Sequence, residues 1–325
     1  MLKATGAIGA GTMIGKAAAQ EAASPKSFKA AVFHTPVLVP PSGDALPAVR
    51  ARNTEAMVVA IEKAMAGADK PRILSFPVLQ LTSAQRAVSG VPMSAVAVDL
   101  ISEPLDKGVF APIVAACRRH NCYVSTSTQE KVPQLPGKFF HTGFIMGPEG
   151  LVLRSPKSQA QSAPEVSYLR DFPEEYTKIF GPDSIMPVVQ TPVGKLACFV
   201  EGEAEVLEAS RLIASKGAEI ILHTSLENGE TPWQALKQAI GFQCHVFLLT
   251  GVTSRNIFAN DPAGKWGAGA ATIVGPDGKI LAQMGGQDEG FAMADINLAA
   301  VAEAKKKFGR NTVPAWNLYT KLYKG

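Results

Sequence analysis

The segment from Gly194 to Glu227 constrains the fold more than any other part of this chain. It reads GKLACFVEGEAEVLEASRLIASKGAEIILHTSLE, with one apolar run opening at Gly194 and another around Ile220. Short apolar runs of this length are typical of buried strands. A helix is predicted between them, over 206–216. A strand, a helix and a second strand in this order indicate a layered α/β protein.

The rest of the chain continues this alternation and shows no internal repeat or long linker. Further strands are predicted over 28–33, 72–76, 123–128, 139–146 and near Val246, and further helices over 53–66, 105–120 and 232–242. Turn residues indicate two antiparallel hairpins, one around Pro148-Glu149-Gly150 and one around Pro276-Asp277-Gly278. The order predicts a single domain over 28–325 with helices on both outer faces.

Composition excludes several classes of function. The chain has 325 residues, of which 46% are hydrophobic and 18% charged, as suits a globular protein with a large core. A net charge of +4, spread along the chain, is too weak to indicate a nucleic-acid partner. No apolar run reaches the ~18 residues that a membrane span needs.

The four cysteines show no spacing typical of a zinc site. Cys122 and Cys198 lie in apolar runs, where cysteine usually behaves as a small buried hydrophobe. We therefore expect no metal and no cofactor.

The first 27 residues differ from the rest and contain an early Lys3 followed by small, weakly apolar residues. They resemble the tail of a twin-arginine export signal, in which Met1-Leu2-Lys3 would follow the arginine pair. This interpretation predicts an exported or periplasmic protein. The alternative is a short amphipathic or disordered N-terminus on a cytoplasmic protein. Either way the segment is left out of the fold prediction.

The segment opened by Gly194 resembles the one that carries the catalytic cysteine in the nitrilase, or carbon–nitrogen hydrolase, superfamily. The family pattern is a Gly-opened strand, a cysteine at a tight elbow, an acidic residue, and then a helix leading to Arg and Gly-Ala. Glu208, Arg211 and Gly217 fall where this pattern places such residues. The cysteine position, seven residues after Gly194, is occupied by Glu201.

Other landmarks of the family occur in the same order over roughly 28–300. They are the first strand FKAAVF, Ser75-Phe76-Pro77, Gln129-Glu130, the loop from Leu153 to Lys157, and the late hairpin GAGAATIVGPDGKIL. The resemblance implies a four-layer α-β-β-α sandwich. It also implies a site with cysteine as nucleophile, glutamate as general base, lysine for the oxyanion, and a second glutamate that holds the geometry.

Each role in that site has a physical reason. A thiolate forms a covalent acyl intermediate and divides one difficult step into two easier ones. The base must take up and return a proton near neutral pH. A fixed cation stabilises the negative charge that develops on the substrate oxygen in the transition state.

Transferring these roles residue by residue leaves the site incomplete. Lys157 stands at the lysine position and Glu130 at the supporting glutamate position, but Val78 stands at the base position and Glu201 at the nucleophile position. We expect Glu201, Lys157 and Glu130 to meet in one pocket as an ion-pair cluster, with Val78 packed beside them. A metal site made of both glutamates and a histidine is conceivable, but no ligand spacing supports it.

Two functions remain open. One is a non-catalytic protein that binds a small-molecule ligand or takes part in an assembly. The other is a hydrolase of amides, nitriles or carbamoyl compounds, or an acyl-transfer enzyme, that uses altered residues. Cys198 is three residues before Glu201 and is predicted to face away from the pocket. A carboxylate at 201 could attack an ester but is a weak nucleophile for an amide. The vacated positions favour the first function.

Two further expectations concern histidines and assembly. His141 and His245 are predicted to face the core or neighbouring strands, and His223 to be a hydrogen-bonded residue at a strand end. The helix over 206–216 carries more apolar side chains than one buried face requires. The resemblance implies pairing of subunits through this helix, so a homodimer or larger homo-oligomer is predicted.

Overall fold

A single α/β sandwich is formed by the parts of the chain that the computed structural model describes, which are residues 27–38, 42–80, 91–102, 105–159, 166–227, 231–254, 269–286, 288–309 and 315–323. The export-signal prediction falls on residues 1–26, outside this description. Within the described parts, no helix is both long enough and apolar enough to cross a membrane.

Twelve strands are described, and hydrogen bonds link them into one sheet with two halves. The first half has the order β5-β4-β3-β2-β1 with β12 beside β1, and the second has β9-β8-β7-β6 with β10 and β11 beside β9. The strands are β1 (Ser27–Thr35), β2 (Pro71–Ser75), β3 (Tyr123–Lys131), β4 (Phe139–Gly147), β5 (Gly150–Pro156), β6 (Val189–Thr191), β7 (Gly194–Val200), β8 (Ile220–Ser225), β9 (Phe247–Thr253), β10 (Ala270–Val274), β11 (Ile280–Gly285) and β12 (Gly290–Asn297).

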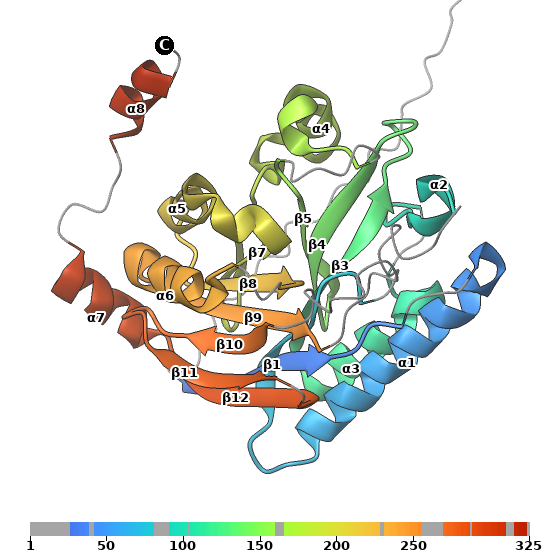
Figure 1. The fold of residues 1–325 in the computed structure, drawn as a ribbon, viewed down its shortest axis with the longest axis horizontal. Coiled ribbons are helices and arrows are strands. Elements are labelled where there is room, and N and C mark those ends of the chain that lie inside the picture. Colours follow the sequence, from blue (N-terminus) through green and yellow to red (C-terminus); the bar gives the residue numbers. More distant parts are fainter. Residues whose placement is uncertain are drawn as a thin grey trace, which may run out of the picture.

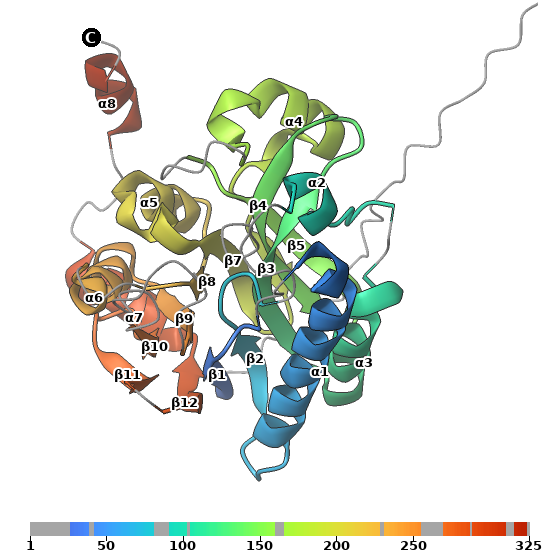
Figure 2. The same ribbon diagram turned by 45° about the vertical axis from the view of Figure 1, so that its right-hand side comes forward.

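The two halves pack face to face, and helices cover both outer faces (Figures 1 and 2). The helices α1 (Leu46–Met65) and α3 (Ala111–His120) cover the first half, and α5 (Leu207–Ser215) and α6 (Trp233–Cys244) cover the second. The remaining helices are α2 (Met93–Val96), α4 (Pro173–Phe180), α7 (Ala299–Phe308) and α8 (Trp316–Tyr323). This arrangement confirms the predicted four-layer sandwich.

Alternation along the strands produces three separate cores between the four layers. Phe144 of β4 packs toward α1 and α3, whereas its neighbour Ile145 packs between the sheet halves. On β7, Cys198 packs between the halves and Phe199 packs toward α5 and α6. Because successive strand side chains point to opposite faces, each of these strands contributes to two cores at once.

The two sheets expected from the resemblance are joined at one place. β1 and β9 run parallel and pair through His34 with Val252 and through Thr35 with Thr253. This short pairing makes the two halves one continuous hydrogen-bonded sheet. The four layers are as expected, but the sheets are not separate.

Two helix boundaries differ from the prediction. α1 begins at Leu46 rather than Asn53, because Pro47 is accommodated in its first turn, where no N–H donor is needed. α3 begins at Ala111 rather than Leu105, because Gly108 adopts a positive φ of 63° and a short 3-10 turn precedes the helix.

We predict that Gly143→Ala destabilises the protein by about 1–3 kcal/mol, because a Cβ at this position would overpack the inner core. The added atom would lie 2.7 Å from the Cys198 Sγ and 2.9 Å from Val200 Cγ2, across the interface of the two halves. Denaturant unfolding measures the effect. The matched change Gly67→Ala meets nothing within 4 Å and should be nearly neutral. Adding Cys198→Ala to Gly143→Ala should restore part of the lost unfolding free energy. Strict additivity of the two single-variant effects would contradict this packing.

Candidate active site

The elbow at the end of β7, where the resemblance places a nucleophile, has a strained backbone, and its residue is a glutamate. Glu201 follows β7 directly and begins the 3-10 turn over Glu201–Glu205 that leads to α5. Its φ is 48°. A positive φ is uncommon for a residue with a side chain, and such strain is often found at functional sites. The sharp turn from strand to helix that the resemblance implies is therefore present in this chain.

Glu201 forms an ion pair with Lys157. The Lys157 Nζ lies 2.9 Å from the Glu201 Oε2. Burial acts to raise the pKa of Glu201, but the charge of Lys157 and its hydrogen bond act against burial, and the net pKa is lowered. Burial acts to lower the pKa of Lys157, but Glu201 outweighs it and the net pKa is raised. Both groups are therefore charged at neutral pH, and the expected ion pair between them is present.

His141 connects this ion pair to the turn that carries the base position. Its Nδ1 lies 3.6 Å from the Glu201 Oε2, and its Nε2 lies 2.9 Å from the Ser127 Oγ. The Ser127 Oγ also accepts a hydrogen bond from the Leu79 backbone N–H at 2.9 Å. Burial lowers the pKa of His141 to about 4. The imidazole is therefore neutral at pH 7 and joins the elbow to the residue next to Val78.

The order serine, histidine, carboxylate is also that of a serine-hydrolase relay, which is recognised by geometry rather than by sequence. Here Ser127 is completely buried. Its hydroxyl oxygen is held by the Leu79 N–H. A substrate carbonyl cannot reach it in this conformation, so the chain of contacts acts as a buried polar connection.

His223 supports the elbow from the opposite side. Its Nε2 donates to the Glu201 carbonyl oxygen at 2.9 Å, and its Nδ1 lies 3.3 Å from the Thr250 Oγ1. Burial lowers the pKa of His223 to about 3. The predicted hydrogen-bonded histidine at a strand end is thus confirmed, and it binds the backbone of the strained residue.

Glu203 ties the lysine loop to the elbow and was not identified from the sequence. Its carboxylate accepts the Ser158 N–H at 2.7 Å and the Val200 N–H at 3.0 Å. Burial raises its pKa, against the effect of these two hydrogen bonds. The one signal for Glu203 was its place as the acidic residue after the elbow.

Glu130 does not join the cluster, and the expectation that it would was wrong. It is paired with Arg154, with the Nε and Oε1 atoms 2.9 Å apart. Across the β3–β4 ladder Glu130 lies opposite Phe140, whereas Gln129 lies opposite His141. Cross-strand partners share a face and successive residues do not. Glu130 is therefore on the face of the sheet opposite to His141 and Glu201.

The remaining predicted residues lie as follows. Val78 is fully buried and its N–H lies 3.5 Å from the Ser225 carbonyl oxygen. Its side chain has no group that can move a proton. The Cys198 thiol faces the inner core beside Gly143, which lies on the same face of β4 as His141, and all four cysteines are buried. Among the described residues, no group of three or more His, Cys, Asp or Glu side chains is placed to hold a metal ion.

His141 is buried, as predicted, but its place in the cluster was missed, because the register of the β4–β5 hairpin shifts. Gly147 lies opposite Gly150, and counting back from this turn would place His141 opposite Pro156. The register shifts between Ile145 and Met146, so Thr142 lies opposite Pro156 instead. Lys157 N–H consequently donates to the His141 carbonyl oxygen at 2.8 Å. The sequence contains no clear mark of this shift.

Comparison with known proteins points to one family. The sequence profile of the carbon–nitrogen hydrolase family matches residues 49–306. A bifunctional nitrilase/nitrile hydratase of Lupinus angustifolius is 26% identical over 144 residues, which cover 40% of this chain and 41% of that protein. Nitrilase 1 of Arabidopsis thaliana is 29% identical over 143 residues, covering 39% of this chain and 41% of that protein. The chain thus matches well under half the length of these relatives.

Solved structures share the fold at lower sequence identity. Nit3 of Saccharomyces cerevisiae, a member of branch 10 of the nitrilase superfamily, superposes with a TM-score of 0.68 at 17% identity, covering 88% of this chain and 96% of that one. A carbon–nitrogen hydrolase of Helicobacter pylori superposes with a TM-score of 0.66 at 18% identity, covering 92% and 99%.

We predict that the free energy of unfolding falls as the pH is lowered from 6.5 toward 4. Burial lowers the pKa of His141 from 6.5 to about 4 and that of His223 from 6.5 to about 3. The unfolded chain takes up these protons in a range where the folded chain does not, so each histidine contributes a slope of about 1.4 kcal/mol per pH unit. Denaturant unfolding across this range measures the slope. His141→Gln should reduce the slope by about 1.4 kcal/mol per pH unit, which is the contribution of one proton. A flat profile would contradict the buried, neutral state of both rings.

Proposed function

We propose that this chain, which belongs to the carbon–nitrogen hydrolase family, binds a small-molecule ligand or a partner and does not catalyse thiol-dependent hydrolysis. The observation that carries the proposal is the ion pair between Lys157 and Glu201 at the nucleophile position. Val78 at the base position supports it, because an apolar side chain cannot transfer protons.

The ion pair removes two catalytic functions at once. A carboxylate with a lowered pKa, bound to an ammonium group, is a poor nucleophile for an amide, and the resulting anhydride lies uphill in energy. The same contact occupies the Lys157 ammonium, which would otherwise be free to stabilise a developing oxyanion. Together the residues of the elbow form a stable, neutralised site rather than a reactive one.

A second candidate is hydrolysis or acyl transfer by altered residues. The observation in its favour is the row of contacts from Ser127 through His141 to Glu201. Burial counts against it, because Ser127 has no exposed surface and a histidine with a pKa of about 4 is a weak base near neutrality. The plant relatives named above are a nitrilase and a nitrilase/nitrile hydratase. Extending either activity to this chain is part of this second candidate.

We predict no turnover above background in a screen of amides, nitriles, ureas and esters. The physical reason is that no accessible nucleophile stands beside a base. Labelling with a fluorophosphonate, which reacts with activated serines, should leave Ser127 unmodified. Thiol-blocking reagents should change nothing. Ester hydrolysis accompanied by labelled Ser127 would establish the second candidate instead, and loss of activity through Cys198 alkylation would overturn the placement of the elbow.

We predict that Glu201→Cys alone does not create amide hydrolysis, whereas Glu201→Cys with Val78→Glu does so at least about a hundredfold faster than the single variant. The thiol needs a base to ionise it and to return a proton to the leaving amine. Initial rates on a simple amide measure this difference. The control is Glu201→Ala with Val78→Glu, which has the base but no thiol. Equal rates for the single and double cysteine variants would show that another group already serves as base.

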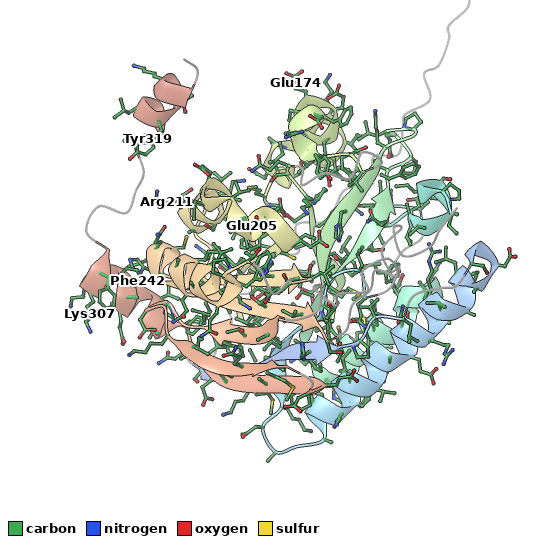
Figure 3. The ribbon with its side chains drawn as sticks, viewed as in Figure 1. Glu174, Glu205, Arg211, Phe242, Lys307 and Tyr319 are labelled. Carbon is green, nitrogen blue, oxygen red and sulfur yellow. The ribbon has the colours of Figure 1, made fainter. Side chains whose placement is uncertain are left out.

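We also propose that the protein assembles as a homodimer or larger homo-oligomer through α5. Its Ala209, Ser210 and Ile213 are buried against the second half of the sheet, but Leu207 on the same helix is 45% exposed. Phe242 of the neighbouring α6 is also exposed, and Figure 3 shows it with Arg211 on the outer side of this layer. Exposed apolar side chains on adjacent helices support an interface there.

We predict that Leu207→Glu converts the assembly to a monomer without unfolding it, since a charge buried in an interface is costly. Light scattering at micromolar concentration measures the mass. The matched control is Val59→Glu on α1, an apolar position in the opposite outer layer that is 61% exposed. This control should leave the mass unchanged. A monomeric wild-type protein would refute the assembly.

A further inference from the structure

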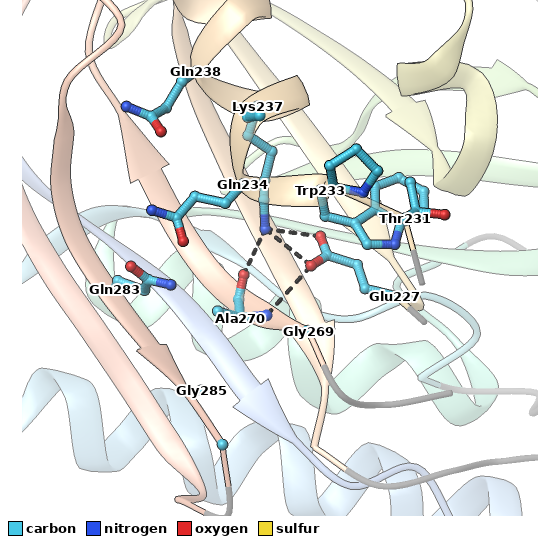
Figure 4. A pocket seen from close by; sticks show the side chains of 13 residues that line it. Glu227, Thr231, Trp233, Gln234, Lys237, Gln238, Gly269, Ala270, Gln283 and Gly285 are labelled. Carbon is cyan, nitrogen blue, oxygen red and sulfur yellow. Dashed lines mark hydrogen bonds and ion pairs between the residues drawn. The ribbon is translucent and has the colours of Figure 1, made fainter. Parts of the chain in front are cut away.

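A cavity of about 700 Å³ opens beside the first turn of α6, away from the residues discussed so far. Its walls come from the end of β8, the start of α6, the start of β10 and the end of β11 (Figure 4). Volumes of this size are usual for small-molecule sites. None of Glu201, Lys157 or His141 lines it.

The floor of the cavity holds a buried ion pair that is already complete. The Lys237 Nζ donates to both Glu227 carboxylate oxygens, at 2.9 and 3.0 Å, and to the Ala270 carbonyl oxygen at 2.8 Å. The Ala270 N–H donates to the Glu227 Oε2 at 3.3 Å. Figure 4 shows these contacts converging between the helix and the strand. All three ammonium protons are used, so this pair cancels its own charge and leaves none for a ligand.

Because Gly269 has no side chain, the backbone before β10 can lie close to the Glu227–Lys237 pair. A Cβ there would lie 2.3 Å from the Glu227 Cβ and from its Oε2. Any larger residue would push the carboxylate into the cavity or out of reach of Lys237. The backbone is therefore built to hold Glu227 against Lys237 and to leave the space above them open.

The first turn of α6 presents backbone donors without acceptors to this space. Its N-cap is Pro232, which supplies no side-chain cap, and no acidic residue lies in the first turn. The Trp233 and Leu236 N–H groups donate to the Thr231 and Pro232 carbonyl oxygens. The two backbone N–H groups between them, on Gln234 and Ala235, have no acceptor among the described residues. Both of these residues line the cavity. The end of a helix with free N–H groups favours negative charge.

Trp233 provides a second, independent donor. Its side chain is only 6% exposed and lines the same cavity. Within the described part of the chain, its indole Nε1 has no hydrogen-bond partner. A buried N–H group left without an acceptor is costly, so a bound molecule that offers an acceptor to it would be stabilised here.

We infer that this cavity binds the carboxylate group of a small organic acid. The two free backbone donors of α6 and the Trp233 N–H supply hydrogen bonds to its oxygens, and the helix end supplies the favourable field. A monoanion fits better than a phosphate dianion, because the lining offers no unpaired lysine or arginine. Gln283 provides an amide group for the polar remainder of the acid. This site is separate from the proposed function and does not rest on it.

The test is calorimetric titration of the full-length protein with benzoate, and with benzamide and benzylamine as neutral and cationic analogues of the same shape. Benzoate is expected to bind saturably, and the two analogues at least about tenfold more weakly. In a ¹⁵N-labelled sample, the Gln234 and Ala235 amide signals should shift on titration with benzoate. Absence of saturable benzoate binding, or equal binding of benzamide, would overturn the inference.

A pair of charge variants on the same helix locates the site. Gln234→Glu places a carboxylate in the exposed first turn, where it caps the free donors and repels an anion, so benzoate binding should fall about tenfold or more. Gln243→Glu adds the same charge at the exposed C-terminal end of α6 and should leave binding unchanged. The first variant should also unfold at a slightly higher temperature, which shows that its loss of binding does not come from misfolding. Equal binding by both variants would place the benzoate elsewhere.

Discussion

An ammonium group withdrawn from water has to be paired, and in this protein Glu201 provides the pairing for Lys157. Lys157 has only 6% of its side chain exposed, and removing such a charge from water costs several kcal/mol unless a counter-charge is present. Glu201 supplies that charge from the elbow. The lowered pKa of Glu201 and the raised pKa of Lys157 both follow from this contact.

The backbone of the elbow is held by interactions that do not involve the Glu201 carboxylate. Glu201 has a positive φ, and His223 binds its carbonyl oxygen. The Glu203 carboxylate accepts one backbone N–H from the lysine loop, at Ser158, and one from the end of β7, at Val200. These interactions act on the backbone and do not depend on the side chain at the elbow. The proposed function, in which the chemistry of the elbow is lost, is therefore compatible with an intact backbone, and function has to be argued from side chains rather than from the fold.

The sequence allowed the layers, most strands and the pairing of Lys157 with Glu201 to be predicted, because those depend on local apolar patterns and on a motif with fixed spacing. It did not allow the partner of Glu130 to be predicted. That depends on which face of β3 the residue occupies, and a shift by one residue reverses every face of a strand. The place of His141 in the cluster was missed for a related reason, since an extra residue in β5 shifts the register between β4 and β5. Glu227 and Lys237 lie ten residues apart on separate elements, and only the folded chain brings them together.

The most direct test of the central claim is a double-mutant cycle at the ion pair, measured by denaturant unfolding at pH 7. Glu201→Gln and Lys157→Met should each cost about 2–3 kcal/mol, because each leaves one charge or one polar group without its partner. The double variant should cost clearly less than the sum of the two. Strict additivity, or single variants as stable as the wild-type protein, would show that Lys157 and Glu201 do not depend on each other and would contradict the account.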